Sequence, residues 1–119
     1  MEYWDIYDEN KRVTGRTMER DVFPMAPEDF HLSVLAVVAR KDGKFLITKR
    51  VMTKPWAAGL WEVSGGAVQA GETSKDAVLR EVKEETGLVI EEPVLFGVKN
   101  WIDEDGTRYI VFLFKAEKY

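Results

Sequence analysis

The sequence predicts an α+β fold in which one helix packs against a mixed β-sheet. Short apolar or β-branched segments, typical of strands, occur both before and after a single amphipathic segment with helical spacing. An order of several strands, one helix and several more strands favours a mixed sheet that is covered by that helix. The length of 119 residues suits a single domain, residues 1–119.

The N-terminal part predicts a hairpin-like preface over residues 1–30, followed by a core over residues 31–119. Apolar residues alternate over residues 4–6 as in a strand, and the polar residues 8–11 are typical of a turn. The core is expected to begin with a buried strand over residues 32–39, which are aliphatic and β-branched.

Turn residues divide the rest of the core into further strands. Asp42-Gly43 predicts a tight hairpin turn, and Gly65-Gly66 is predicted to end a short strand. The strands are expected at residues 45–48, 60–63 and 94–98, followed by a strand pair that is joined at residues 103–106 and ends with residues 109–114.

One helix is expected from about Ser74 to Thr86. Thr73 followed by Asp76 is a variant of the capping box, which marks a helix N-terminus. Gly87 is well placed to end the helix. The helix therefore stands between the two groups of strands.

Composition and charge exclude several classes of protein. The formal net charge of -4 excludes a non-specific nucleic-acid binder, which needs clustered cations. The absence of cysteine excludes disulfides, thiolate metal sites and a cysteine nucleophile. The longest apolar stretch, residues 34–39, is too short to span a bilayer, and the first residues lack the features of a signal peptide. We therefore expect a cytoplasmic protein that binds no membrane.

One face of the predicted helix is acidic. Glu81, Glu84 and Glu85 share an arc of about 100°, because a helix turns about 100° per residue. Carboxylates about 5 Å apart repel by on the order of 3 kcal/mol at an effective dielectric constant of roughly 20. A hard divalent cation would offset this, and magnesium suits oxygen ligands better than zinc in a chain whose lone histidine is His31. Taken alone, the same glutamates also fit a solvated helix face.

The surrounding residues decide between these two interpretations. Gly66 is followed after five residues by Glu72, and after seven more by Arg80-Glu81-Val82-Lys83-Glu84-Glu85-Thr86-Gly87-Leu88. This arrangement over residues 66–88 resembles the complete Nudix box, with no departure at any fixed position. The resemblance implies a Nudix-type α/β/α sandwich. It also implies hydrolysis of a small molecule in which a nucleoside diphosphate is linked to a further group, with magnesium or manganese.

The resemblance further implies roles for individual residues. Glu81 is implied to accept a proton from the attacking water. Arg80 resembles the family arginine that orients a catalytic glutamate through a salt bridge. Glu72 is counted with these catalytic residues, although the helix dipole alone would stabilise a carboxylate at its position. The implied metal ligands are Glu81, Glu84, Glu85 and the backbone carbonyl of Gly65.

Candidates for substrate binding lie before the box. Lys49 and Arg50 could contact phosphate oxygens, and Trp56 could stack on a base. The alternative is that the cations form a solvated rim and that the tryptophan anchors a loop.

Two other functions remain open at this stage. A Nudix-fold module could bind or sense a nucleotide without turnover. Residues 4–10 and Thr14-Gly15-Arg16 also resemble the lead-in of the branch that includes isopentenyl-diphosphate isomerases. Those isomerases use a cysteine and several histidines, whereas this chain has no cysteine and one histidine.

The C-terminal side of the core is expected to be short. The family usually continues after the last strand with a second helix that covers the sheet and with a further glutamate, but only residues 115–119 follow here. The C-terminal helix is therefore expected to be absent from this chain, and Glu104 or Glu117 could replace the glutamate. An uncovered sheet face favours association, so a homodimer is expected.

Overall fold

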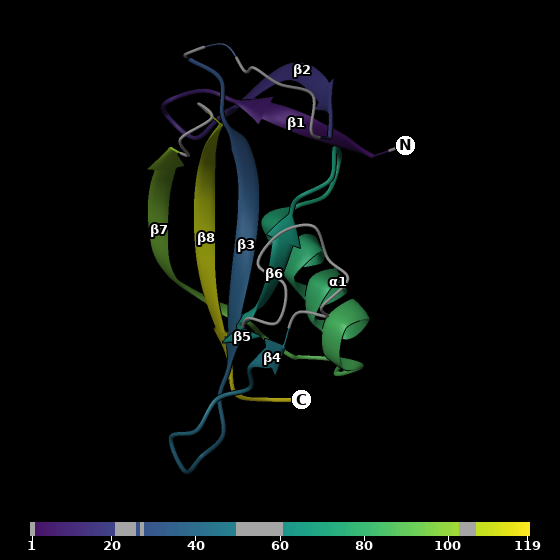
Figure 1. The fold of residues 1–119 in the computed structure, drawn as a ribbon, viewed down its shortest axis with the longest axis vertical. Coiled ribbons are helices and arrows are strands. Elements are labelled where there is room, and N and C mark those ends of the chain that lie inside the picture. The colour runs from purple at the N-terminus through teal and green to yellow at the C-terminus, as the bar shows by residue number, and fades with distance from the viewer. Residues whose placement is uncertain (1, 21–25, 27, 50–60, 103–106) are drawn as a thin grey trace.

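The computed structural model describes residues 2–20, 26, 28–49, 61–102 and 107–119. Within these ranges the chain forms one four-stranded sheet, two two-stranded sheets and one helix (Figure 1). The elements are β1 (Tyr3–Tyr7), β2 (Val13–Glu19), β3 (His31–Val38), β4 (Thr48–Lys49), β5 (Trp61–Glu62), β6 (Ser64–Ala67), α1 (Ser74–Thr86), β7 (Val94–Ile102) and β8 (Arg108–Ala116).

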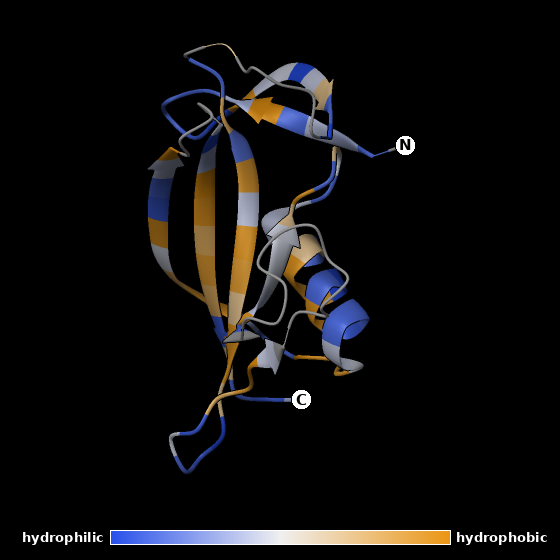
Figure 2. Cartoon of the chain, in the orientation of Figure 1, coloured by the Kyte–Doolittle hydropathy of each residue, from blue (hydrophilic) through white to orange (hydrophobic). Residues whose placement is uncertain are grey.

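The four-stranded sheet is mixed and has the order β6-β3-β8-β7. β3 pairs antiparallel with β6 and parallel with β8, while β7 and β8 are antiparallel. The predicted fold class is therefore confirmed. β3 and β8 form the apolar centre of the sheet, as the orange ribbon in Figure 2 shows. Val34, Ala36 and Val38 alternate along β3 and are buried in one cluster with the helix residues Val78 and Val82.

The helix α1 has the bounds that the sequence predicted. The Thr73 hydroxyl accepts a hydrogen bond from the Asp76 N–H at 3.1 Å, and the Thr73 N–H donates to the Asp76 carboxylate at 3.4 Å. Gly87 ends the helix in the left-handed conformation with φ 78°. The helix lies beside β6 and β3 (Figure 1). Among the described residues, no helix is long and apolar enough to cross a membrane.

The predicted preface is an antiparallel hairpin of β1 and β2, which crosses one end of the main sheet (Figure 1). Two backbone hydrogen bonds of 2.8 and 2.9 Å join Tyr7 to Phe30. Arg16 donates two hydrogen bonds, of 2.9 and 3.2 Å, to the buried carboxylate of Asp29. These contacts fix the hairpin to the segment that leads into β3.

The histidine lies in the packing between this hairpin and the sheet. His31 is 6% exposed, and its ring stacks on Trp4 with the ring centroids 4.1 Å apart. Tyr109 of β8 lies on another side, with centroids 5.1 Å apart. His31 thus contributes to the interior packing of the fold.

Several predicted bounds differ from the structure around glycines and turns. The prediction that Gly65-Gly66 ends a strand is wrong, because both residues lie inside β6 and pair with β3. The strand expected at residues 45–48 is reduced to a bridge between Ala39 and Phe45 and to the short β4. β7 continues to Ile102 because its pairing with β8 carries it through polar residues that weaken the local strand signal.

The strand β7 lies at one edge of the main sheet and exposes large apolar side chains. In the described part of the chain, its only strand partner is β8. An exposed apolar edge of this length is a potential pairing surface. The exposed residues are Val94, Leu95, Phe96, Val98, Trp101 and Ile102.

Candidate active site

The arginine that precedes the acidic helix face is the centre of a carboxylate network. Arg80 donates from Nε and Nη2 to the two oxygens of Glu72, at 2.7 and 2.8 Å. Its Nη1 donates to Glu81 at 2.8 Å and to Glu84 at 3.5 Å. Its Nη2 also donates to the backbone carbonyl of Ala67 on β6, at 3.2 Å. One guanidinium therefore ties the helix, the loop before it and β6 together.

Glu72 is the main partner of this arginine. The hydrogen bonds from Arg80, followed by a backbone hydrogen bond from Gln69 at 2.9 Å, lower the pKa of Glu72 against the effect of its partial burial. The hydrogen bond to Glu72, followed by the hydrogen bond to Glu81, raises the pKa of Arg80. Glu72 thus holds Arg80 in position. This contact is additional to the stabilisation by the helix dipole that the sequence indicated.

Two glycines of β6 allow carboxylates of the helix to approach the strand closely. A Cβ atom on Gly66 would lie 2.5 Å from Glu81 Oε1 and 2.8 Å from Oε2. The Gly65 N–H donates to Glu85 Oε2 at 3.3 Å, and a Cβ atom there would collide with the carbonyl oxygen of Val34. A side chain at Gly66 would therefore displace the Glu81 carboxylate, whereas a side chain at Gly65 would meet the backbone of β3.

The two carboxylates beside these glycines carry unfavourable charge. Burial raises the pKa of Glu81, although Arg80 acts in the opposite direction. Partial burial and the charge of Glu81 raise the pKa of Glu85. Glu2, on the N-terminal hairpin, adds a smaller repulsion at Glu81. A bound cation would offset this accumulated negative charge.

The donor set fits a hard divalent cation. Glu81 and Glu85 offer carboxylate oxygens beside Gly65, and carboxylate, carbonyl and water oxygens are the ligands that magnesium and manganese prefer. Glu84 is 60% exposed and would have to turn inward to join them. In the part of the chain that the structure describes, no three acidic or histidine side chains gather closely enough to hold an ion as they stand.

The structure thus gathers Gly65, Glu72, Arg80, Glu81 and Glu85 at the junction of β6 and α1, with Glu84 at its rim. The backbone of Lys49 lies in β4, whereas the predicted binding residues Arg50 and Trp56 lie outside the described residues.

Two polar residues near this junction have no counterpart among the sequence-predicted site residues. Gln69 donates its N–H to Glu72 and its side-chain amide to Glu2 Oε1 at 3.4 Å. Gln69 occupies an unspecified position of the box, and Glu2 is distant in the sequence. Only a prediction of how the N-terminal hairpin docks could have identified them.

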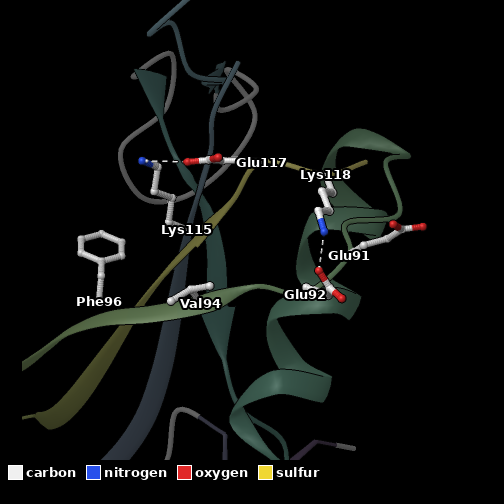
Figure 3. Close-up of a pocket in the computed structure, with 7 residues that line it drawn as sticks. All are labelled: Glu91, Glu92, Val94, Phe96, Lys115, Glu117 and Lys118. Carbon is white, nitrogen blue, oxygen red and sulfur yellow. Dashed lines mark hydrogen bonds and ion pairs between the residues drawn. The ribbon is translucent and has the colours of Figure 1, made fainter. Parts of the chain in front are cut away.

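A separate hollow of about 340 Å³ lies between the end of β8 and the segment before β7 (Figure 3). Two ion pairs lie in it: Lys118 contacts Glu92 at 2.6 Å, and Lys115 contacts Glu117 at 3.1 Å. Glu117, a candidate replacement for the additional glutamate, is thus engaged with Lys115. The other candidate, Glu104, lies outside the described residues.

The mixed sheet, the capped helix and the arginine-centred carboxylates form the arrangement that the residues of the box predicted. A family model described as NUDIX domain matches residues 29–118, and the chain belongs to the Nudix family. Nudix hydrolases generally use divalent metal ions, which agrees with the carboxylate donors described above.

Individual relatives support the same assignment. The chain is 38% identical over 92 residues to an uncharacterised Nudix hydrolase of Listeria monocytogenes, covering 76% of this chain and 54% of the relative. It is 39% identical over 74 residues to an ADP-ribose pyrophosphatase of Methanocaldococcus jannaschii, covering 62% and 43%. The chain therefore spans about half the length of the curated relatives it matches.

A solved structure extends the likeness of the fold to nearly the whole chain. A protein from Deinococcus radiodurans superposes with a TM-score of 0.69 and 22% sequence identity, covering 99% of this chain and 74% of that protein. This likeness concerns the fold alone. It includes the N-terminal hairpin, which precedes the segment that the family model matches.

We expect the two glycines of β6 to respond differently to alanine. Gly66→Ala should lower the free energy of unfolding by less than about 1 kcal/mol, because the Glu81 side chain can rotate away from the new methyl group. Gly65→Ala should cost about 1–3 kcal/mol, because backbone atoms block its methyl group. Urea denaturation measures both values, and a crystal structure of Gly66→Ala reports the Glu81 position. Equal destabilisation of the two variants would contradict this account.

The opposite pKa shifts of Glu72 and Glu85 predict opposite effects of neutralisation in protein kept metal-free with EDTA. The pKa of Glu72 is lowered, so its stabilisation is present above the ordinary carboxyl pKa and is lost as pH falls through the folded-state value. Glu72→Gln should therefore cost about 1–2 kcal/mol at pH 7 and progressively less in acid.

The pKa of Glu85 is raised, so the fold favours its neutral form, and the associated stability is lost as pH rises through the folded-state value. Glu85→Gln should therefore be more stable than the wild type at pH 7 and equal to it in acid. Urea denaturation of both variants at pH 7 and at about pH 4 measures the two trends. Destabilisation by Glu85→Gln at pH 7 would contradict the inferred charge strain.

Proposed function

We propose that the chain is a metal-dependent pyrophosphohydrolase, which cleaves a phosphoanhydride bond in a nucleoside diphosphate linked to a further group. The observation that carries this proposal is the Arg80 network, which holds Glu81 beside Glu85 against the two glycines of β6. Family membership supports it, as does the likeness to a relative named ADP-ribose pyrophosphatase.

Glu81, Glu84 and Glu85 would hold the metal, with help from the backbone carbonyl of Gly65. Magnesium is the first choice and manganese the second, because both prefer oxygen ligands. When bound, such an ion lowers the pKa of a water ligand and neutralises charge on phosphoryl oxygens. On the substrate side, Lys49 and Arg50 would contact phosphate oxygens and Trp56 would stack on the base, as the sequence suggested.

The protein side chains divide the remaining tasks. Glu81 accepts a proton from the attacking water, a role that suits a carboxylate whose pKa is raised by burial. Arg80 positions Glu81 through the 2.8 Å ion pair, and Glu72 holds Arg80 with two hydrogen bonds. Arg80 and Glu72 thus act through Glu81.

A second candidate is a nucleotide-binding or sensor module without turnover. It is favoured by the exposure of Glu84, which leaves the metal ligands incomplete in the described geometry. An isomerase of the isopentenyl-diphosphate type is less well supported, because the chain has no cysteine and its histidine is buried against Trp4.

We expect Glu84→Gln and Glu85→Gln each to lower kcat/KM by at least about 100-fold, since each removes a charged metal ligand. The assay is magnesium-dependent release of phosphate or nucleoside monophosphate from a panel of nucleoside diphosphate derivatives. Lys83→Gln is the matched control, because Lys83 lies on the same helix turn and is exposed. Its activity should equal that of the wild type.

The same panel separates the candidate functions. Binding of a nucleotide by the wild type without metal-dependent turnover favours the sensor module. Conversion of isopentenyl diphosphate contradicts both leading candidates.

We also propose that the chain forms a homodimer through β7. The exposed apolar residues of this edge strand support the proposal, because a second copy can pair with the open edge and cover them. Val98→Lys, at the middle of β7, should shift the protein to a monomer in sedimentation velocity, whereas Lys83→Gln should not. A monomeric wild type at tens of micromolar would refute the dimer. The cytoplasmic location stays a prediction from the sequence.

A further inference from the structure

The turn that carries Glu72 is bonded to the first strand of the N-terminal hairpin. Figure 1 shows β1 beside the connection from β6 to α1. The Gly71 N–H donates to Asp5 Oδ2 at 3.0 Å, and the Ala70 N–H donates to the Tyr3 carbonyl at 2.8 Å. We propose that Asp5 is a positioning residue for the hydrolysis, which holds this turn and thereby Glu72 in place. The inference rests on the proposed function and gives the hairpin a part in it.

The turn spans residues 69–72, and each of its backbone N–H groups has a partner. The Glu72 N–H donates to the Gln69 carbonyl at 3.0 Å, which closes a β-turn, and Gly71 has the positive φ, 84°, of the third residue of a type II turn. The Gln69 N–H donates to the Glu72 carboxylate at 2.9 Å. The two central N–H groups therefore depend on β1 for their acceptors.

The acceptor of Gly71 lies on a rigid support. Side chains alternate along a strand, and Trp4 and Ile6 on either side of Asp5 are buried, so Asp5 lies on the opposite face of β1. The Trp4 ring stacks on His31 of β3, which fixes β1 to the main sheet. Because an ionised carboxylate accepts a stronger hydrogen bond than a neutral group, replacement of Asp5 should release the turn.

The position of the turn reaches the proposed catalytic glutamate through Arg80. Glu72 accepts hydrogen bonds of 2.7 and 2.8 Å from Arg80, and Arg80 donates to Glu81 at 2.8 Å. Water can replace the lost acceptor of Gly71, but it does not tie the turn to β1. A displacement of about 1 Å at reacting groups can cost about 100-fold in rate. Asp5 thus acts on Glu81 through the turn, from outside the segment that the family model matches.

Kinetics of hairpin variants test the role of Asp5. Asp5→Ala should lower kcat by about 10-fold or more, because a shifted Glu81 no longer aligns with the attacking water. KM should stay within about 2-fold, because Asp5 acts on Glu81 and not on substrate binding. Asp5→Asn should keep kcat within about 3-fold, since its amide oxygen can accept the same hydrogen bond. The assay uses magnesium and the member of the substrate panel that the wild type cleaves fastest.

Two further variants guard against effects on folding. Thr17→Ala is the matched control, because Thr17 is exposed and pairs with Asp5 across the hairpin. Its kinetics should equal those of the wild type. Asp5→Leu removes the acceptor at similar volume and suits a strand at least as well, so it should show the same loss of kcat as Asp5→Ala. Wild-type kcat in Asp5→Leu, or a loss of kcat in Asp5→Asn as large as in Asp5→Leu, overturns the inference.

A double-variant cycle tests whether Asp5 acts through Glu72. In the Glu72→Gln background, where the contact with Arg80 is already weakened, Asp5→Leu should lower kcat by less than about 3-fold, compared with about 10-fold in the wild type. Equal losses in the two backgrounds would mean that Asp5 acts by another route, and the positioning role would be wrong.

The side chain of Arg80 provides a readout that needs no turnover. Its Nε–H donates to Glu72 at 2.7 Å, so the NMR resonance of this proton reports the contact, and Arg80→Lys assigns the resonance. Asp5→Leu should shift or broaden it, and Asp5→Asn should leave it unchanged. If the wild type hydrolyses no member of the panel, the proposed function fails, and this resonance still reports whether Asp5 positions Arg80. An unchanged resonance in Asp5→Leu overturns the inference even if the wild type is active.

Discussion

Arg80 carries the interaction on which the rest of the site depends. Its guanidinium is only 22% exposed, and a charge that is largely removed from water needs partners for its donors. Glu72, Glu81 and the Ala67 carbonyl satisfy those donors from three separate segments. The arginine therefore fixes the distance between helix and strand, and with it the place of Glu81 against Gly66.

This arrangement concentrates unfavourable charge at one end of the network. Glu72 is stabilised as an anion by Arg80, whereas burial raises the pKa of Glu81, and partial burial and the charge of Glu81 raise the pKa of Glu85. The fold thus gains stability from Glu72, which positions Arg80. It loses stability at Glu81 and Glu85, the carboxylates proposed to bind metal. Such opposition between stability and function is common where a site must remain poised for a cation.

The sequence predicted the helix to the residue, since its bounds depend on local chemistry at Thr73, Asp76 and Gly87. It also predicted the fold class, and four residues of its candidate site, Glu72, Arg80, Glu81 and Glu85, lie together in the structure. It misjudged Gly65 and Gly66, because glycine usually interrupts a strand and the contact that requires it here comes from a helix later in the chain. The parts played by Glu72, Gln69 and Glu2 depend on how three segments dock, which local patterns do not encode.

The two glycines of β6 limit which residues of the site can be replaced. Gly65 and Gly66 present only backbone atoms to Glu81 and Glu85, so a side chain at Gly65 would disturb the packing on β3 and one at Gly66 would displace the Glu81 carboxylate. A change of substrate preference is therefore expected to come from residues around these two glycines and not from the glycines themselves.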